Sequence, residues 1–123
     1  MTGDTLGMQV TATPDGQAML FALEGSLDIA TAPSLRAALL ERAEHDHHEI
    51  IVDLSRLEFL DSTGLGALIG ARKRAAEHAG SLRLVAQEGQ ILRLLRITVL
   101  LDVFAVYPSV EAALAGETRL VGL

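Results

Sequence analysis

The residues with most chemical potential form one short polar step, Asp-Ser-Thr-Gly at residues 61–64, between two apolar runs. It places a carboxylate and two hydroxyls directly before a segment with the spacing of a helix, in which glycine recurs at Gly66 and Gly70. Such a step could cradle a phosphate, hold a nucleophilic serine, or present a serine for modification. Each chemistry requires a different surrounding pattern.

A phosphate-binding glycine loop is the first interpretation, because Gly64-Leu65-Gly66 resembles the beginning of a dinucleotide fingerprint. The spacing does not fit, since the next glycine is Gly70 and the preceding strand pattern ends near Leu54, too far upstream for a tight phosphate turn. The chain also lacks the Gly-Lys-Ser/Thr sequence of a P-loop. The sequence therefore predicts no cofactor here.

A catalytic serine is the second interpretation, and it requires a glycine two residues to either side. Gly64 supplies one, but Leu60 occupies the other position. A general base must also lie within hydrogen-bond reach. The histidines are expected at helix ends far from Ser62; they are His45, His47, His48 and His78. We therefore expect no enzymatic activity.

The third interpretation makes Ser62 a phosphate acceptor at the start of a helix. Free N–H groups and the helix dipole stabilise an anion there, so the fold would tolerate the added charge of about −1.5 to −2. Asp61 and Asp28 are expected neighbours, so a phosphate would strengthen a negative spot. The alternative is that Ser62 only caps the helix, which contributes roughly 1 kcal/mol. Residue chemistry alone favours the cap.

Composition narrows the class of protein. The 123 residues suit one domain, and 16 acidic against 10 basic residues give a net charge of −6, so nucleic acid and anionic membranes are poor partners. Without cysteine there is no disulfide, thiolate or cysteine metal site. We see neither a signal-peptide pattern nor an apolar run long enough for membrane insertion. These features predict a small cytoplasmic protein.

Hydrophobic periodicity predicts an α/β fold of order ββαβαβαβα, a mixed sheet with an N-terminal hairpin and helices packed mainly on the sheet. The hairpin turn is Pro14-Asp15-Gly16, and Leu57, Phe59 and Leu60 are placed in a loop. The expected strands are 8–12, 19–23, 50–54, 82–86 and 103–106. The expected helices begin at Thr31 or Ala32, run over 62–79 with Gly80 as the C′ residue, surround Ile91, Leu94 and Leu95, and extend from a Ser109 cap to Gly116.

Three further patterns have competing interpretations. The acidic and histidine-rich run 44–49 resembles a metal site, but a solvated turn is favoured because nothing fixes four ligands, so no metal is expected. The cations 72–74 form either a solvent-facing surface or a contact for an acidic partner. Gly66 and Gly70 share one helical face that allows close approach by another backbone, and packing within this domain is the favoured reason.

Longer segments carry a family resemblance. DLSRLEFLDSTGLGALIGARKRA resembles the signature of STAS domains in bacterial anti-sigma factor antagonists. EGSLDIATAPSLRAAL and ILRLLRITVLLDVFAVYPSVEAAL resemble other parts of the same family, in family order. The resemblance implies a single STAS-type domain over residues 1–116, followed by a C-terminal tail over 117–123.

The resemblance also implies a function without catalysis. The unphosphorylated form would bind an anti-sigma factor that is a serine kinase, and so free the sigma factor. Phosphorylation of Ser62, or less favourably Thr63, would end binding, and a serine phosphatase would reset the cycle. A constitutive docking subunit of a stressosome-like or transport complex is the alternative. The partner-binding residues implied are Asp28, Asp61, Ser62, Thr63, Gly64, Leu65 and Gly66. Family members often have glycine where this chain has Val99.

Overall fold

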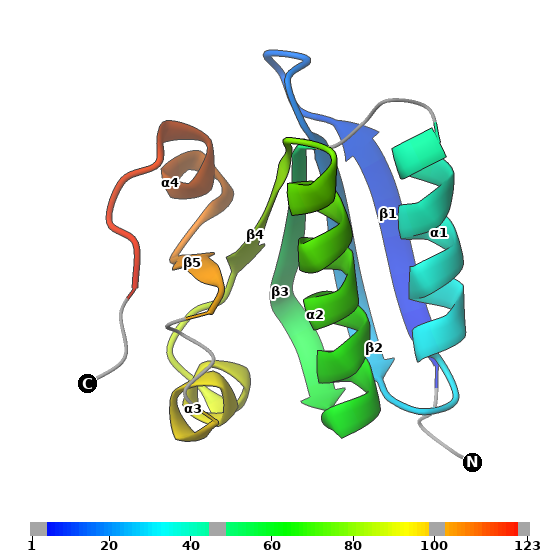
Figure 1. Ribbon diagram of the computed structural model, residues 1–123. Helices are drawn as coiled ribbons and strands as arrows, with labels where there is room; N and C mark the ends of the chain where they lie inside the picture. The colour runs from blue at the N-terminus through cyan, green and yellow to red at the C-terminus, as the bar shows by residue number, and fades with distance from the viewer. Residues whose placement is uncertain (1–4, 45–48, 99–102, 121–123) are drawn as a thin grey trace.

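The computed structural model describes residues 5–44, 49–98 and 103–120 (Figure 1). Its elements follow the predicted order ββαβαβαβα, so the expected fold class is confirmed. The strands are β1 (Leu6–Ala12), β2 (Met19–Leu27), β3 (Glu49–Leu60), β4 (Ser81–Val85) and β5 (Ala105–Tyr107). The helices are α1 (Ala32–Glu44), α2 (Ser62–Glu77), α3 (Gln90–Ile97) and α4 (Val110–Ala115).

The five strands form one mixed sheet in the order β1-β2-β3-β4-β5. β1 and β2 pair antiparallel as a hairpin, whereas the pairs β2–β3, β3–β4 and β4–β5 are parallel. Because β2 and β3 are parallel, their carboxyl ends meet at one edge of the sheet. The chain enters α1 and α2 from that edge, and the two helices then run side by side across one face (Figure 1).

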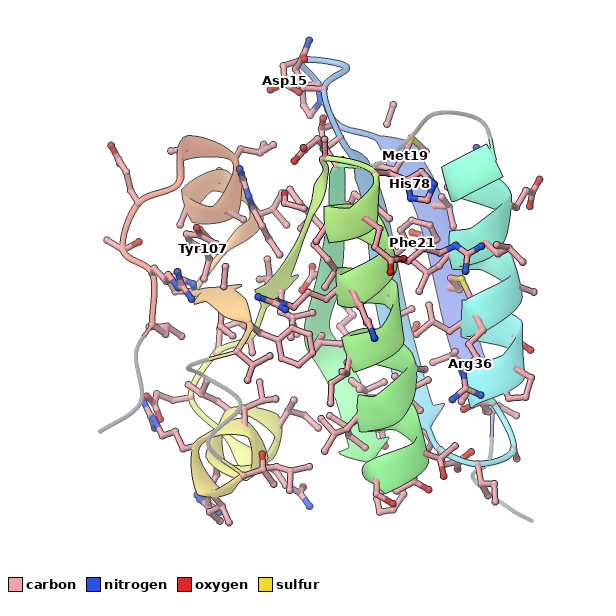
Figure 2. The ribbon with its side chains drawn as sticks, in the orientation of Figure 1. Asp15, Met19, Phe21, Arg36, His78 and Tyr107 are labelled. Carbon is pink, nitrogen blue, oxygen red and sulfur yellow. The ribbon has the colours of Figure 1, made fainter. Side chains whose placement is uncertain are left out.

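The sheet separates two hydrophobic clusters. The larger one lies under α1, α2 and α3 and includes the fully buried Phe21, Leu68 and Leu92. A smaller one lies under α4 on the opposite face and is centred on Ile51 and Tyr107. Figure 2 shows the two aromatic side chains, Phe21 beside α2 and Tyr107 beside α4. Successive strand residues point to opposite faces, so β3 contributes to both clusters.

Strand β3 is longer than the sequence pattern predicted. Residues 55–60 were expected in a loop, but they continue the strand, with two register shifts against β2. Ala22 pairs with Asp53 and Glu24 with Arg56, so β3 contains an extra residue there, and another follows before Phe59. Because each bulge inserts one extra residue, the alternation of side chains between the two faces is shifted by one residue after it. The residues buried along this stretch are therefore Leu54, Leu57 and Leu60, three apart.

The end of α2 and the start of β5 also differ from expectation. Gly80 was predicted as the left-handed C′ residue of α2, but Ala79 has that conformation, with φ 59°. The N–H of Gly80 then donates to the carbonyl of Ala75 at 2.8 Å and that of Ala79 to Ala76 at 3.1 Å, which is a Schellman motif one residue earlier than predicted. Strand β5 begins two residues later than expected. The Ser109 cap of α4 and its end at Gly116 are confirmed.

Several predictions fall outside or at the border of the described residues. His45, His47, His48 and Val99 lie outside them. Within the segment expected as a tail, Leu120 forms an antiparallel bridge with Val106, its N–H 2.7 Å from the Val106 carbonyl. Among the described helices, none combines the length and apolar character needed to cross a bilayer.

Candidate functional site

Asp61 joins the ends of β2 and β3 at the start of α2. Its Oδ1 accepts from the N–H of Gly64 at 2.9 Å, which makes Asp61 the N-cap. Its Oδ2 accepts from the N–H of Ile29, 3.2 Å away in the loop that follows β2. Its own N–H donates to the carbonyl of Leu27 at 3.2 Å. One carboxylate therefore caps α2 and ties two neighbouring loops together.

This geometry corrects the alternative in which Ser62 is the cap. Ser62 is the first residue of α2 and is exposed, while Thr63 after it is partly buried. Within the described part of the chain, the Ser62 hydroxyl has no hydrogen-bond partner, because Asp61 already supplies the capping oxygen. First-turn N–H groups of a helix lack intrahelical acceptors, so the hydroxyl lies in a region of positive potential.

Asp28 lies in the loop between β2 and α1 and is only 7% exposed. Its Oδ1 accepts from the N–H groups of Ala30 at 2.9 Å and Thr31 at 3.1 Å. In return, the Asp28 N–H donates to Thr31 Oγ1 at 2.9 Å, and the Thr31 hydroxyl is 2.8 Å from the carbonyl of Ser26. This reciprocal pattern has the form of a capping box. Asp28 therefore stabilises the conformation of the loop through these hydrogen bonds.

The two glycines in the first turns of α2, Gly64 and Gly66, differ in their packing. A Cβ on Gly64 would lie 2.5 Å from the carbonyl oxygen of Leu27 and 2.8 Å from Cδ1 of Leu60, so α2 approaches β2 as closely as glycine permits. A Cβ on Gly66 would meet nothing within 4 Å, and this residue is exposed. Gly64 is therefore closely packed, whereas the internal packing predicted for Gly66 is wrong. Leu65 between them is buried.

Three exposed apolar side chains at this end of the molecule were not predicted from the sequence. Ile29 is 73% exposed, Ile97 71% and Phe59 48%; we refer to these three as the apolar rim. Phe59 and Ile97 line one shallow groove between β3 and α3, and Ile29 is tied to Asp61 through its N–H. An isolated exposed apolar residue has little meaning, but these three lie at the end of the sheet where the carboxyl ends of β2 and β3 meet and α2 begins. The sequence did offer one indication of this surface, because Ile29 is an apolar residue in the polar loop between Asp28 and Thr31.

The position of His78 argues against it as a general base for Ser62. His78 follows Ser62 by sixteen residues, which is about 24 Å along the helix axis, and Figure 2 shows it at the far end of α2. Its Nδ1 is 2.9 Å from the carbonyl of Arg74. No cluster of three or more histidine, aspartate or glutamate side chains with the arrangement of a metal site occurs among the described residues.

Comparison with known proteins gives a consistent result. The family model described as "STAS domain" matches residues 9–113. An anti-sigma-B factor antagonist from Staphylococcus epidermidis is 32% identical over 87 residues, which cover 71% of this chain and 81% of that protein.

Solved structures resemble this fold along nearly its whole length. An anti-sigma factor antagonist from Mycobacterium paratuberculosis superposes with a TM-score of 0.83 at 26% identity, covering 94% of this chain and 96% of that one. The Bacillus cell fate determinant SpoIIAA, solved in its phosphorylated form, has a TM-score of 0.69 at 21% identity and covers 89% of this chain and 98% of its own. At this identity the second similarity concerns the fold alone.

Proposed function

Because the chain belongs to the STAS domain family, we propose that it is an anti-sigma factor antagonist controlled by phosphorylation of Ser62. The unphosphorylated form binds an anti-sigma factor with serine kinase activity, and phosphorylation releases it. A serine phosphatase restores binding. The observation that supports this proposal best is the exposed Ser62 hydroxyl, which makes no hydrogen bond within the described residues and lies beside a separate capping carboxylate.

The surroundings of Ser62 suit a surface that binds in its uncharged form. The apolar rim of Ile29, Phe59 and Ile97 offers a partner apolar area to bury at the same end of the sheet as the hydroxyl. A phosphate would place about −1.5 to −2 charges beside the Asp61 carboxylate. Burial of that charge in an interface requires desolvation, and an acidic partner surface would repel it. A loss of about 2.7 kcal/mol weakens binding by roughly a hundredfold.

The proposal is tested with the anti-sigma factor kinase of the same organism. We expect Ser62→Ala to bind this kinase whether or not ATP is present, and Ser62→Asp to bind at least tenfold more weakly. Gln17→Glu is the matched control, because it adds one negative charge in the exposed β1–β2 hairpin at the opposite end of the sheet. We expect this variant to bind as the wild type does.

Intact-mass measurement after incubation with the kinase and ATP provides a second readout. The wild type should gain one phosphate and Ser62→Ala none. A phosphate that remains on Ser62→Ala would move the acceptor to Thr63 or elsewhere. No mass increase in the wild type, together with equal affinities of the Ser62 variants, would favour the constitutive docking subunit instead.

A further inference from the structure

A second surface lies away from Ser62, in the groove between α1 and α2. Its lining is mostly apolar, with Leu39 and Leu40 from α1 and Ala67 and Ala71 from α2. Leu39 and Ala67 are buried, whereas Leu40 is 39% exposed. The two helices lie side by side on the outside of the sheet (Figure 1), so nothing from the described part of the chain covers the groove.

The wall that α2 contributes to the groove includes a glycine, Gly70. A Cβ added to Gly70 would meet no heavy atom within 4 Å, so the absence of a side chain is not required by packing inside this domain. Glycine in a helix interior costs about 1 kcal/mol relative to alanine. The favoured expectation of internal packing at Gly70 is therefore wrong. A bare backbone in the wall lets another chain approach α2 closely.

Each wall of the groove also carries one cation. Arg36 comes from α1, where Figure 2 labels it, and Arg74 comes from α2. Neither guanidinium forms an ion pair or hydrogen bond with any of the residues that the structure describes. Two unpaired arginines beside an apolar floor are notable in a chain whose net charge is −6. A molecule in the groove would meet a positive charge on both sides.

We propose that this groove binds an acidic amphipathic helix of a partner protein. A third helix fits between two parallel helices, with its apolar residues at positions i, i+3 or i+4 and i+7 directed onto the floor. Carboxylates on the two flanks of such a helix would then meet Arg36 and Arg74, and arginine pairs with carboxylates in a bidentate geometry. A small free anion would leave the apolar floor without a contact. This surface does not depend on the proposed switch at Ser62.

The probe is a fluorescent amphipathic peptide of about 18 residues, long enough to form a helix when bound. It has leucines on one face and glutamates on both flanks, and its twin has lysines in place of the glutamates. We expect the full chain to bind the acidic peptide at least tenfold more tightly than the basic twin, as measured by fluorescence anisotropy. Amide chemical shifts should move at Leu40, Gly70 and Ala71.

Variants test the groove directly. Arg36→Glu with Arg74→Glu should weaken the acidic peptide at least tenfold and strengthen the basic twin. Arg72→Glu is the matched control, since Arg72 is exposed on α2 outside the groove, and it should change affinity less than threefold. Gly70→Leu should fill the groove and abolish binding, with an unchanged circular dichroism spectrum.

Three results would overturn the proposal. One is that the acidic peptide fails to bind, and another is that both peptides bind equally well. The third is that the shifted amides lie at the apolar rim and the double arginine variant binds as the wild type does. Because Ser62→Asp should leave peptide binding unchanged, failure of this proposal is distinguishable from failure of the phosphorylation switch.

Discussion

Replacement of Gly64 by alanine tests how the structure holds the start of α2. The new Cβ would lie 2.5 Å from the Leu27 carbonyl oxygen, 2.9 Å from Leu27 Cγ and 2.8 Å from Leu60 Cδ1. The leucine side chains can adjust, but the carbonyl cannot move freely because it accepts the Asp61 N–H. Forced insertion of a methyl group costs about 1–3 kcal/mol, and the helix propensity of alanine returns less than about 1 kcal/mol in a first turn. We expect a net loss of about 1–2 kcal/mol.

Gly66→Ala is the matched control, because it makes the same chemical change two residues later on the same helix. Its Cβ meets nothing within 4 Å, so only the propensity gain of about 0.5–1 kcal/mol remains. The measurement is urea unfolding followed by far-UV circular dichroism, with the slope m unchanged in both variants. The two midpoints should move in opposite directions from that of the wild type.

Equal stability of the two variants would refute this reasoning. It would mean that α2 does not pack against the Leu27 carbonyl closely enough to exclude a Cβ at residue 64. The position of Ser62 relative to the loop after β2 would then be unexplained, because Gly64 is the residue that permits this approach. A gain in stability for Gly64→Ala would be stronger evidence in the same direction.

Three other predictions concern single contacts. Asp61→Ala should lose about 1–2 kcal/mol in urea unfolding, since it removes the cap of α2 and a second hydrogen bond to the neighbouring loop; no loss would contradict the role of Asp61. Ala79→Gly should gain about 1 kcal/mol, because φ at this position is 59° and glycine adopts it without strain; a loss would place the left-handed residue elsewhere. The Arg96 guanidinium lowers the pKa of Glu88 through a hydrogen bond, so this contact stabilises the fold above the usual glutamate pKa and is lost as pH falls through the lowered value. Arg96→Gln should raise the Glu88 pKa in an NMR titration, and an unchanged pKa would contradict the contact.

The element order could be predicted from the sequence because a regular helix or strand buries apolar residues at a fixed spacing. The prediction failed in β3, where Leu54, Leu57 and Leu60 are three residues apart and match no strand period. Two bulges cause this spacing, and they are visible only once the register with β2 is known. Local patterns cannot report a partner strand that lies far along the chain.

The candidate site was predictable in position but not in detail. The sequence placed the polar step at a helix start, yet it could not tell that Asp61 is the cap, since both Asp61 and Ser62 are good capping residues. The distinction depends on where the loop after β2 lies, because Asp61 also accepts from the Ile29 N–H. Similarly, Asp28 was expected at the partner surface, but its Oδ1 turns inward to the loop N–H groups, which leaves Ile29 as the exposed neighbour.

The division of roles between Asp61 and Ser62 explains why a phosphate would affect binding more than folding. A capping serine would have to break its own hydrogen bond when modified, whereas the Ser62 hydroxyl is already free of the cap. Two like unit charges about 6 Å apart repel each other in water by only about 0.7 kcal/mol, so the Asp61 carboxylate would repel a phosphate on Ser62 only weakly in the free chain. First-turn N–H groups offset part of this repulsion. At an effective dielectric constant of about 20, near that of a partly desolvated interface, the same repulsion rises to about 3 kcal/mol. The rise is about 2 kcal/mol for each unit of charge, or about 3–4 kcal/mol for a phosphate of about −1.5 to −2 charges. A hundredfold loss of affinity requires about 2.7 kcal/mol, so a chain that stays folded can still release its partner.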